Sequence, residues 1–402
     1  MSLIAAILVF GLIILFHEFG HFLMAKRGGI GVVEFSLGMG PRLFSVVKGG
    51  TRYSLKAFPF GGSCMMLGED LDLEEDTGQD GDKWASGSRE SAKDAQSREA
   101  SGSRESRLDR KNAVRQENQP GRENTVRQAH PECRGTFFND TPAWTRFLVI
   151  AGGPLFNFIL AFLGACFIIS AVGYEPTDVY SVTKGYPAEA AGIRAGDVIT
   201  HINGKRMHNY GDILNYISFH PGRTLTIAFR RGQEKQTAVI EPKFSEEYGR
   251  YLIGLSYGGR RRSESLFTTA KYGYYELCYW VDTTFESLKM IVRRQVGAND
   301  IAGPVRIVSM LDNTVKESRE FGLMAVLLNL MNMCVLLSVN LGVMNLLPIP
   351  ALDGGRLVFI LLEALRGRPV DREKEGMIHM AGMAVLMVLM VLILFNDIRN
   401  ML

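Results

Sequence analysis

The stretch LIAAILVFGLIILFHEFGHFLM, residues 3–24, decides how the rest of this sequence is interpreted. It is almost wholly apolar and long enough to cross a hydrocarbon core roughly 30 Å thick. A signal peptide is the alternative, but no Lys or Arg precedes the run and no small-residue cleavage site follows it. The run ends instead at Lys26 and Arg27, which is a stop-transfer pattern. We therefore expect residues 1–25 to form a transmembrane helix.

This helix contains the motif HEFGH at residues 17–21. On a helix, His17 and His21 project from the same face and can bind one Zn²⁺, while Glu18 lies beside them as a general base for a water molecule. Ionisable groups are costly in an apolar span, so they are functional candidates by default. A polar patch that joins helices is the alternative, but it would rarely supply both ligand spacing and a base. At 1.5 Å per residue, Glu18 lies about 22 Å beyond Leu3, toward the predicted cytoplasmic side.

A catalytic zinc site needs a third protein ligand, and the best candidate is Asp353. It lies in the stretch NLLPIPALDGG, residues 345–355, where Pro348 and Pro350 interrupt a helix. Irregular backbone at membrane depth is tolerated only where it lines a protein or water-filled site. The preceding apolar run, 321–345, covers roughly 36 Å if helical, which brings Asp353 to the cytoplasmic side as well. A helix cap after the proline turn is the alternative role for Asp353.

Three further apolar segments predict membrane helices at 145–173, at 321–366 with a break, and at 377–396. With the first helix they give four spans and place both termini outside the cytoplasm. Positive residues set this orientation, because they lie in the loops between spans one and two and between spans three and four. These residues are Lys26, Arg27, Arg134, Arg146, Arg366, Arg368, Arg372 and Lys374.

Composition argues against a nucleic-acid partner and against structural roles for cysteine. The net charge of +3 is small, so no overall field points to nucleic acid as a partner. The five cysteines are scattered and lack CxxC spacing, so they predict neither a disulfide framework nor a thiolate zinc site.

Two different segments separate the first and second spans. Residues 26–68 contain alternating runs at Val32–Ser36 and Arg52–Ala57 between glycine-rich turns, which predict a membrane-associated β-hairpin region. Residues 69–140 are rich in Ser, Arg, Glu, Asp and Gln and poor in aliphatic residues. Such a segment cannot bury enough apolar surface to fold, so we predict a disordered cytoplasmic linker. A regulatory or docking segment is the alternative.

Residues 174–244, between the second and third spans, are expected to form a compact extracytoplasmic domain. The segment GYPAEAAGIRAGDVI, residues 185–199, resembles PDZ domains, a family that binds extended peptides by adding a strand to a sheet edge. An extracytoplasmic amphipathic region, 245–320, follows. The remaining histidines lack ligand spacing, and we expect them to be surface or PDZ-domain residues: His130, His201, His208, His220 and His379.

The expected fold is therefore a polytopic α-helical membrane protein with a small membrane-associated β-sheet and one PDZ-like domain. With HEFGH and NLLPIPALDGG in this order, the chain resembles the bacterial site-2 proteases, and within them the regulator-of-sigma-E protease branch. Supporting signatures are GMGP at 38–41, PFGG at 59–62, AGGPLFN at 151–157 and AGPVRI at 302–307. The sequence departs from the family at Ser63–Met66, where an aromatic and a basic residue are common, and in its longer linker.

The resemblance implies a site and a substrate class. It implies Zn²⁺ held by His17, His21 and Asp353, with Glu18 as the general base. It also implies regulated cleavage of a single-pass membrane protein, usually an anti-sigma factor, after a site-1-type protease has trimmed its outer part. The enzyme would lie in the bacterial inner membrane as a multi-pass protein and cut near the cytoplasmic face. The family uses polar residues at two further positions, Asn157 and Asn345, to hold or unwind the substrate helix; interhelical hydrogen bonding is the alternative.

Two other function classes stay open at this point. One is a membrane-anchored PDZ scaffold with a structural metal, and the other is a zinc transporter. The set of three ligands with a base argues against the first, and the single set together with the PDZ-like domain argues against the second.

Overall fold

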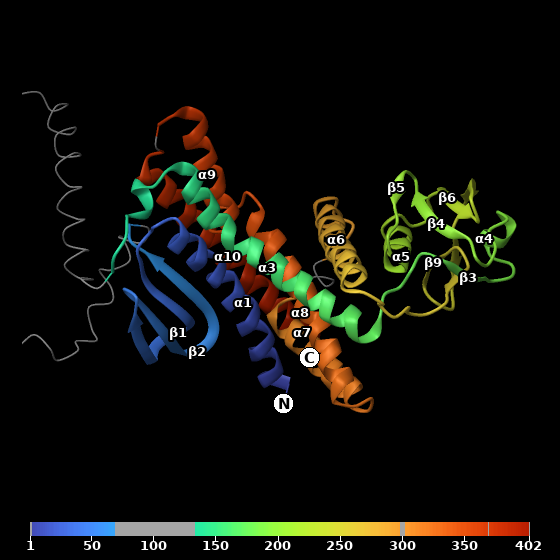
Figure 1. Ribbon diagram of the computed structural model, residues 1–402, viewed down its shortest axis with the longest axis horizontal. Coiled ribbons are helices and arrows are strands. Elements are labelled where there is room, and N and C mark those ends of the chain that lie inside the picture. The colour runs from blue at the N-terminus through green and yellow to red at the C-terminus, as the bar shows by residue number, and fades with distance from the viewer. Residues whose placement is uncertain (1, 69–132, 298–301, 369, 402) are drawn as a thin grey trace, which may run out of the picture. The chain divides into compact units, whose positions relative to one another are not determined.

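The computed structural model describes residues 2–68, 133–297, 302–368 and 370–401 (Figure 1). The elements in chain order are α1 (Ser2–Arg27), β1 (Val32–Lys48), β2 (Thr51–Met66), the 3-10 helix η2 (Phe138–Asp140), α3 (Ala143–Val172), β3 (Val179–Val182), α4 (Pro187–Ala190), β4 (Val198–Ile202), β5 (Lys205–Arg206), α5 (Tyr210–Phe219), β6 (Leu225–Arg231), β7 (Glu234–Ile240), β8 (Lys243–Ser245), β9 (Arg250–Leu252), β10 (Leu255–Tyr257), α6 (Leu266–Val292), α7 (Pro304–Arg319), α8 (Leu323–Leu346), α9 (Asp353–Arg366) and α10 (Arg372–Met401).

Most of the predicted linker, 69–140, lies outside the described residues. Its last part, 133–140, is described and differs from a disordered segment. It contains η2, and the side chains of Phe137 and Phe138 are buried. These aromatic residues supply the apolar surface that the rest of the range lacks, so the ordered chain begins earlier than predicted.

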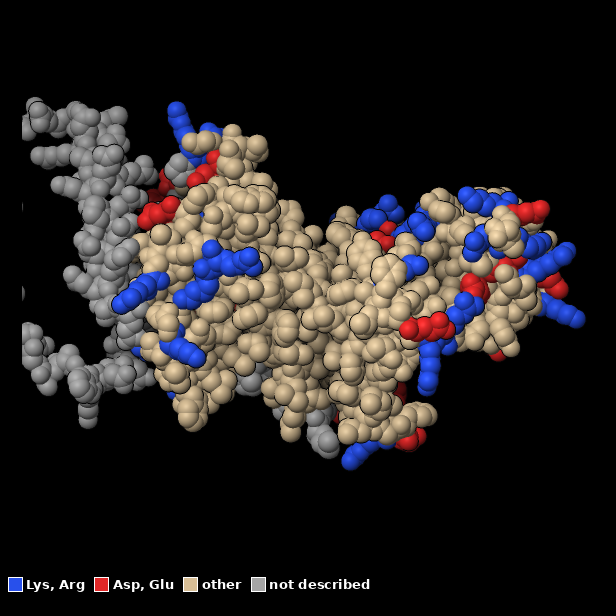
Figure 2. Space-filling model, in the orientation of Figure 1, with Lys and Arg blue, Asp and Glu red and all other residues tan. Residues whose placement is uncertain are grey.

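Four of the described helices are long and apolar enough to cross a membrane, as predicted: Ile4–Arg27, Ala143–Val172, Leu323–Leu346 and Glu373–Arg399. The last is longer than the predicted segment 377–396 because its charged first turn continues the same helix. Helices α1, α3 and α8 pack together through buried residues, among them Ile13, Leu160 and Cys334. Figure 2 shows few charged side chains over the bodies of the spans and many over the domain that contains β3–β10.

The third predicted span is broken as expected. Helix α8 ends at Leu346, and the next residue, Leu347, is extended because it precedes a proline. The chain then reverses and opens α9 at Asp353. This reversal is tight: a Cβ on Gly354 would lie 2.0 Å from the Leu347 carbonyl oxygen, so only glycine fits. The prolines and the glycine pair therefore place Asp353 at the start of a helix.

The chain divides into two compact units, Met1–Gly20 with Ile150–Leu402 and His21–Val149, and each is described by itself. In the second unit, β1 and β2 fold back on themselves. Residues 34–37 pair with 52–55 on one side and with 62–65 on the other, while 42–48 pair with 51–56. The predicted small sheet thus has four strand segments, and 42–48 and 62–65 form its two edges.

Glu34 stabilises this arrangement from the middle of the sheet. Its buried carboxylate accepts hydrogen bonds from Arg42 Nε (3.0 Å) and Nη2 (3.2 Å). Burial alone would raise the pKa of Glu34, but the hydrogen bonds from Arg42 and Ser54 and the charge of Lys56 outweigh it and hold the pKa below its usual range. The sheet is therefore held by a buried, ionised carboxylate.

The domain predicted as PDZ-like contains a four-stranded sheet of order β5-β4-β6-β7, a two-stranded sheet of β10 and β3, and helix α5. Its core includes Ile253, which follows the predicted boundary at residue 244. Strand β10 also pairs with β3, so the domain extends to Tyr257. The boundary was predicted too early because the last strands are only three residues long and carry no clear alternation. The predicted amphipathic region contains, after these strands, the helices α6 and α7.

Candidate metal centre

Helix α1 carries both histidines of the HEFGH motif in its buried face. His17 is 9% exposed and His21 is 8% exposed, one helical turn apart. Gly20, between them, lies against α3: a Cβ there would be 2.2 Å from the Gly152 carbonyl oxygen. The small residues of both helices thus let α1 and α3 approach closely. Half-buried Glu18 follows His17 on the same helix.

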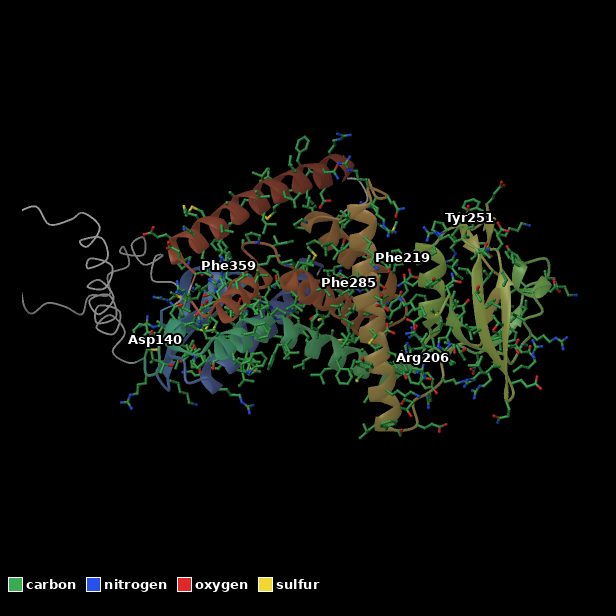
Figure 3. The ribbon with its side chains drawn as sticks, turned by 90° about the horizontal axis from the view of Figure 1, so that it is seen from above. Asp140, Arg206, Phe219, Tyr251, Phe285 and Phe359 are labelled. Carbon is green, nitrogen blue, oxygen red and sulfur yellow. The ribbon has the colours of Figure 1, made fainter. Side chains whose placement is uncertain are left out.

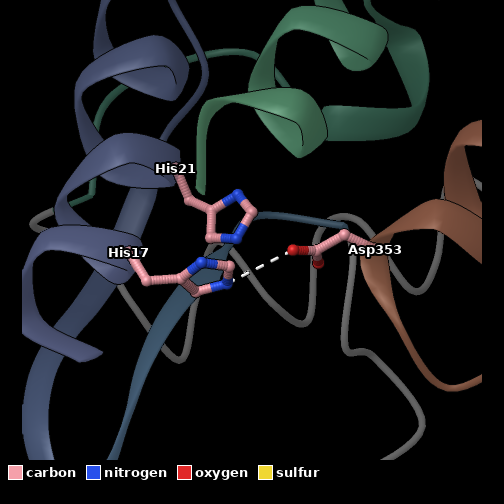
Figure 4. Close-up of side chains that lie close together, drawn as sticks. All are labelled: His17, His21 and Asp353. Carbon is pink, nitrogen blue, oxygen red and sulfur yellow. Dashed lines mark ion pairs between the residues drawn. The ribbon is translucent and has the colours of Figure 1, made fainter. Parts of the chain in front are cut away.

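The third predicted ligand, Asp353, arrives from the start of α9. One ligand atom from each of His17, His21 and Asp353 lies within 4.8 Å of the others (Figure 4). His17 Nε2 and Asp353 Oδ2 are 3.2 Å apart. Two imidazoles and a carboxylate are a donor set that zinc takes in catalytic sites, where a fourth position stays open for water or substrate.

The hydrogen bond at His21 fixes which nitrogen is available. His21 Nδ1 donates to the Val149 carbonyl oxygen at 2.9 Å. The proton of the neutral ring therefore sits on Nδ1, and Nε2 carries the lone pair that can bind a metal. Metal-ligating histidines generally donate their second ring nitrogen in this way.

Asn157 determines in the same way which ring nitrogen of His17 can bind a metal. This residue of α3 is fully buried, and its amide lies 3.2 Å from His17 Nδ1. Among the described residues, Asn157 Oδ1 has no hydrogen-bond partner. A half-turn of the amide brings Oδ1 to face Nδ1–H, which pairs these two atoms, so that Nε2, the nitrogen near Asp353 and Asn345, carries the lone pair that can bind a metal. The site therefore fits Zn²⁺ by its donors and by the groups that orient them.

The second asparagine singled out in the sequence, Asn345, lies at the other nitrogen. Its Nδ2 is 3.4 Å from His17 Nε2. Asn157 and Asn345 thus contact the His17 ring from α3 and α8. Ser338 Oγ of α8 donates to the Asn157 carbonyl oxygen at 2.9 Å, which ties these two helices together beside the ring.

The histidines outside the motif fall in two places. His201, His208 and His220 belong to the PDZ-like domain, as expected, and His130 lies outside the described residues. The expectation for His379 was wrong, because this residue lies in α10 and its Nδ1 accepts from the backbone N–H of Ala351 at 3.0 Å. No spacing in the sequence indicates the contact between His379 and Ala351. The one available signal was the position of His379 within the predicted fourth span.

A buried HExxH pair that meets an aspartate across membrane helices defines the class of an intramembrane zinc metalloprotease. The chain matches the profile of Peptidase family M50 over residues 5–389 and belongs to that family. It is an M50 zinc metalloprotease, a peptide hydrolase and a multi-pass membrane protein.

Relatives that match over nearly their whole length support the assignment as a zinc metalloprotease. The chain is 32% identical to the zinc metalloprotease RasP of Bacillus licheniformis, over 100% of this chain and 99% of that protein. It is 30% identical to the regulator of sigma-W protease RasP of Bacillus subtilis, again over 100% and 99%. A putative zinc metalloprotease of Clostridium acetobutylicum is 30% identical over 99% of this chain and 97% of that protein. The enzyme is therefore of the RasP type.

Among solved structures, the PDZ domain of an SdrC-like protein from Listeria innocua is 27% identical over 22% of this chain and 100% of its own, with a TM-score of 0.20. Because this TM-score is low, the term PDZ-like rests on the sequence signature.

Proposed function

We propose that this RasP-type protease cleaves a single-pass membrane protein whose outer part has already been trimmed by a site-1-type protease, and that an anti-sigma factor is its substrate. The observation that carries the proposal is the set of ligand atoms of His17, His21 and Asp353 within 4.8 Å of one another, with both histidines on a candidate membrane span and Asp353 shortly after another. The name of the Bacillus subtilis relative, regulator of sigma-W protease, supports the link to sigma-factor control.

The proposed topology follows from charge. Lys and Arg lie in the loops between spans one and two and between spans three and four, which favours a cytoplasmic position for those loops and for the linker. The PDZ-like domain is then extracytoplasmic in the bacterial inner membrane. In this orientation HEFGH and Asp353 both come at the cytoplasmic end of their helices, so the cut falls near that face.

The proposed mechanism assigns a task to each side chain of the site. Zinc, when bound, polarises the scissile carbonyl and lowers the pKa of a water molecule. Glu18 accepts a proton from that water and later donates it to the leaving amine. Asn157 holds the His17 ring from Nδ1, and Asn345 lies at Nε2, where it can also hydrogen-bond an unwound substrate backbone.

A substrate helix must be unwound before its carbonyl can react. We propose that the β1–β2 sheet accepts the extended segment by strand addition. Among the described residues, segment 42–48 has a strand on one side only, and its exposed Phe44 and Val46 present an apolar edge. A hollow of about 300 Å³ lies beside it, lined by residues that include Phe35, Leu37 and Leu55. An apolar edge of this kind suits a segment drawn from a membrane helix.

The PDZ-like domain is proposed to exclude substrates with intact bulky outer domains rather than to bind one specific C-terminus. Tyr210 supports this role: its hydroxyl donates to the Leu255 carbonyl oxygen at 2.9 Å, and its ring stacks on Tyr257. The side chain thus occupies a main-chain acceptor of β10, where an added peptide strand would bond.

One experiment separates proteolysis from the other function classes. The chain is co-expressed with a trimmed single-pass substrate as the parent, as Glu18→Gln and as Glu317→Gln, an exposed control on α7. Product from the parent and the control but not from Glu18→Gln supports the proposal. Equal product from all three refutes it, and zinc transport that survives Glu18→Gln supports a transporter.

A further inference from the structure

The loop 347–352 presents Asp353 to the site, and its backbone conformation is unusual. Ala351, two residues before the ligand, has a φ of 77°, a left-handed conformation that residues with a Cβ rarely adopt. Pro348 and Pro350 have no N–H to offer to any stabilising hydrogen bond. The loop therefore has few N–H groups of its own with which to hold this turn.

The N–H groups of the loop show what holds it. Leu347, Ile349 and Leu352 donate to carbonyl oxygens of α8 or of the loop itself, at 3.1, 2.7 and 3.2 Å. The N–H of Ala351 instead donates to the side chain of His379, at 3.0 Å to Nδ1. The strained residue is thus the one bonded to another helix.

His379 is fixed on α10 for this contact. Its side chain is 17% exposed, and its ring lies 5.5 Å from that of Phe359 on α9, which Figure 3 labels. One turn further along α10, Gly382 lies directly against the loop, since a Cβ there would be 2.4 Å from Pro350 Cβ. The backbone of α10 therefore packs on the same loop that His379 bonds.

The hydrogen bond also defines the state of the ring. Because Nδ1 accepts, it carries no proton, and the ring proton sits on Nε2. That nitrogen lies 4.0 Å from Glu375 Oε1, one turn earlier on α10. This separation is beyond hydrogen-bond distance, so the bond from the Ala351 N–H is what fixes Nδ1 as the acceptor.

We propose that His379 is a positioning residue of the metal centre. By accepting from the Ala351 N–H it holds the left-handed turn, and this turn sets where the Asp353 carboxylate lies relative to His17. The fourth span thereby contributes to the zinc site without supplying a ligand.

The test uses substitutions that keep or remove an acceptor at the Nδ1 position. In His379→Asn the amide oxygen can occupy that position, in His379→Gln it lies one bond further out, and in His379→Leu there is no acceptor. Met380→Leu, at an exposed site on the same helix, is the matched control. Zinc affinity of the detergent-solubilised full chain is measured by competition with a chelator, and kcat and KM are measured with a model substrate.

We expect His379→Leu and His379→Gln to weaken zinc binding by about tenfold, at the low end of the effects of outer groups on metal affinity. Their kcat should fall while KM stays within about twofold, because substrate contacts are untouched. His379→Asn and Met380→Leu should keep the parent values. Parent-like zinc affinity in His379→Leu, or equal losses in His379→Asn and His379→Gln, would overturn the proposal. If His379→Leu does not fold, as judged by thermal unfolding, the comparison of His379→Asn with His379→Gln still tests the proposal.

Discussion

Asn157 and His17 form a buried pair in which the amide lies 3.2 Å from Nδ1 of the ring. One residue comes from α3 and the other from α1, and the close approach of the two helices at Gly20 and Gly152 permits the contact. The pair determines which nitrogen of His17 faces Asp353, so the two helices are coupled to the metal centre through one hydrogen bond.

This pair yields the first prediction. Asn157→Ala should weaken zinc binding by about 10- to 100-fold, the range for groups that orient a metal-ligating histidine. Asn157→Asp should retain more of it, because a carboxylate also accepts from Nδ1–H. Asn329→Ala, which removes the hydrogen bond from Asn329 on α8 to Ser318 on α7, is the control. The idea fails if chelator competition gives the Asp and Ala variants the same affinity.

The second prediction concerns helix packing. Gly20→Ala should destabilise the protein by about 1–3 kcal/mol, because its Cβ would lie 2.2 Å from the Gly152 carbonyl oxygen and the backbone must shift. Gly11→Ala is a matched control on the same helix, since nothing lies within 4 Å of the added Cβ. Thermal unfolding in detergent and zinc content give the readout. Equal behaviour of the two variants would contradict close packing at Gly20.

The third prediction is a pH dependence of the contact between α5 and α6, two neighbouring helices marked by Phe219 and Phe285 in Figure 3. Burial, together with the charges of Glu175 and Asp212, raises the pKa of Glu276 on α6 to about 7. Asn209 at the start of α5 donates to this carboxyl at 3.5 Å.

The direction of the change in stability with pH follows from the raised pKa of Glu276. Between about pH 4.5 and 7 the folded state binds more protons at Glu276 than the unfolded state does, so stability falls as pH rises through this window. Glu276→Gln should flatten that slope and raise stability at pH 8. Glu286→Gln is the control, because Lys289 lowers the pKa of Glu286 below the window. Thermal unfolding from pH 5 to 8 measures both; an unchanged slope in Glu276→Gln would count against the assignment.

The fourth prediction tests strand addition at the sheet edge. Proline substitutions within 43–48, at positions whose N–H points away from 51–56, should reduce cleavage because proline cannot donate to an added strand, while zinc content stays at the parent level. Alanine at the same positions keeps every N–H and is the matched control. Cleavage by the proline variants at the parent rate, with the sheet intact, would exclude this edge as the substrate contact.

The fifth prediction concerns the PDZ-like domain. Deleting Tyr174–Tyr257, from the predicted start of the domain to the end of β10, should relax the need for prior trimming. Cleavage of a substrate with its outer domain intact, in cells that lack the first protease, measures the effect. Strict dependence on trimming after the deletion would argue against an outer gate.

The local features of this protein follow from short stretches of its sequence. Apolar runs set the four spans, the spacing of His17 and His21 follows from the helical repeat, and Pro348 and Pro350 break the third span before Asp353. These features depend on residues close in the chain, which is why periodicity and turn chemistry predict them.

How separate elements meet becomes visible only in the folded structure. The contacts of Asn157 and Asn345 with one imidazole, the back-folded pairing of residues 34–37, the extension of the PDZ-like domain to Tyr257 and the bond from Ala351 to His379 have no counterpart in any spacing. Each depends on which side chains face one another after helices or strands pack. That choice is set by shape and by the need to pair buried polar groups, and both act between residues far apart in the chain.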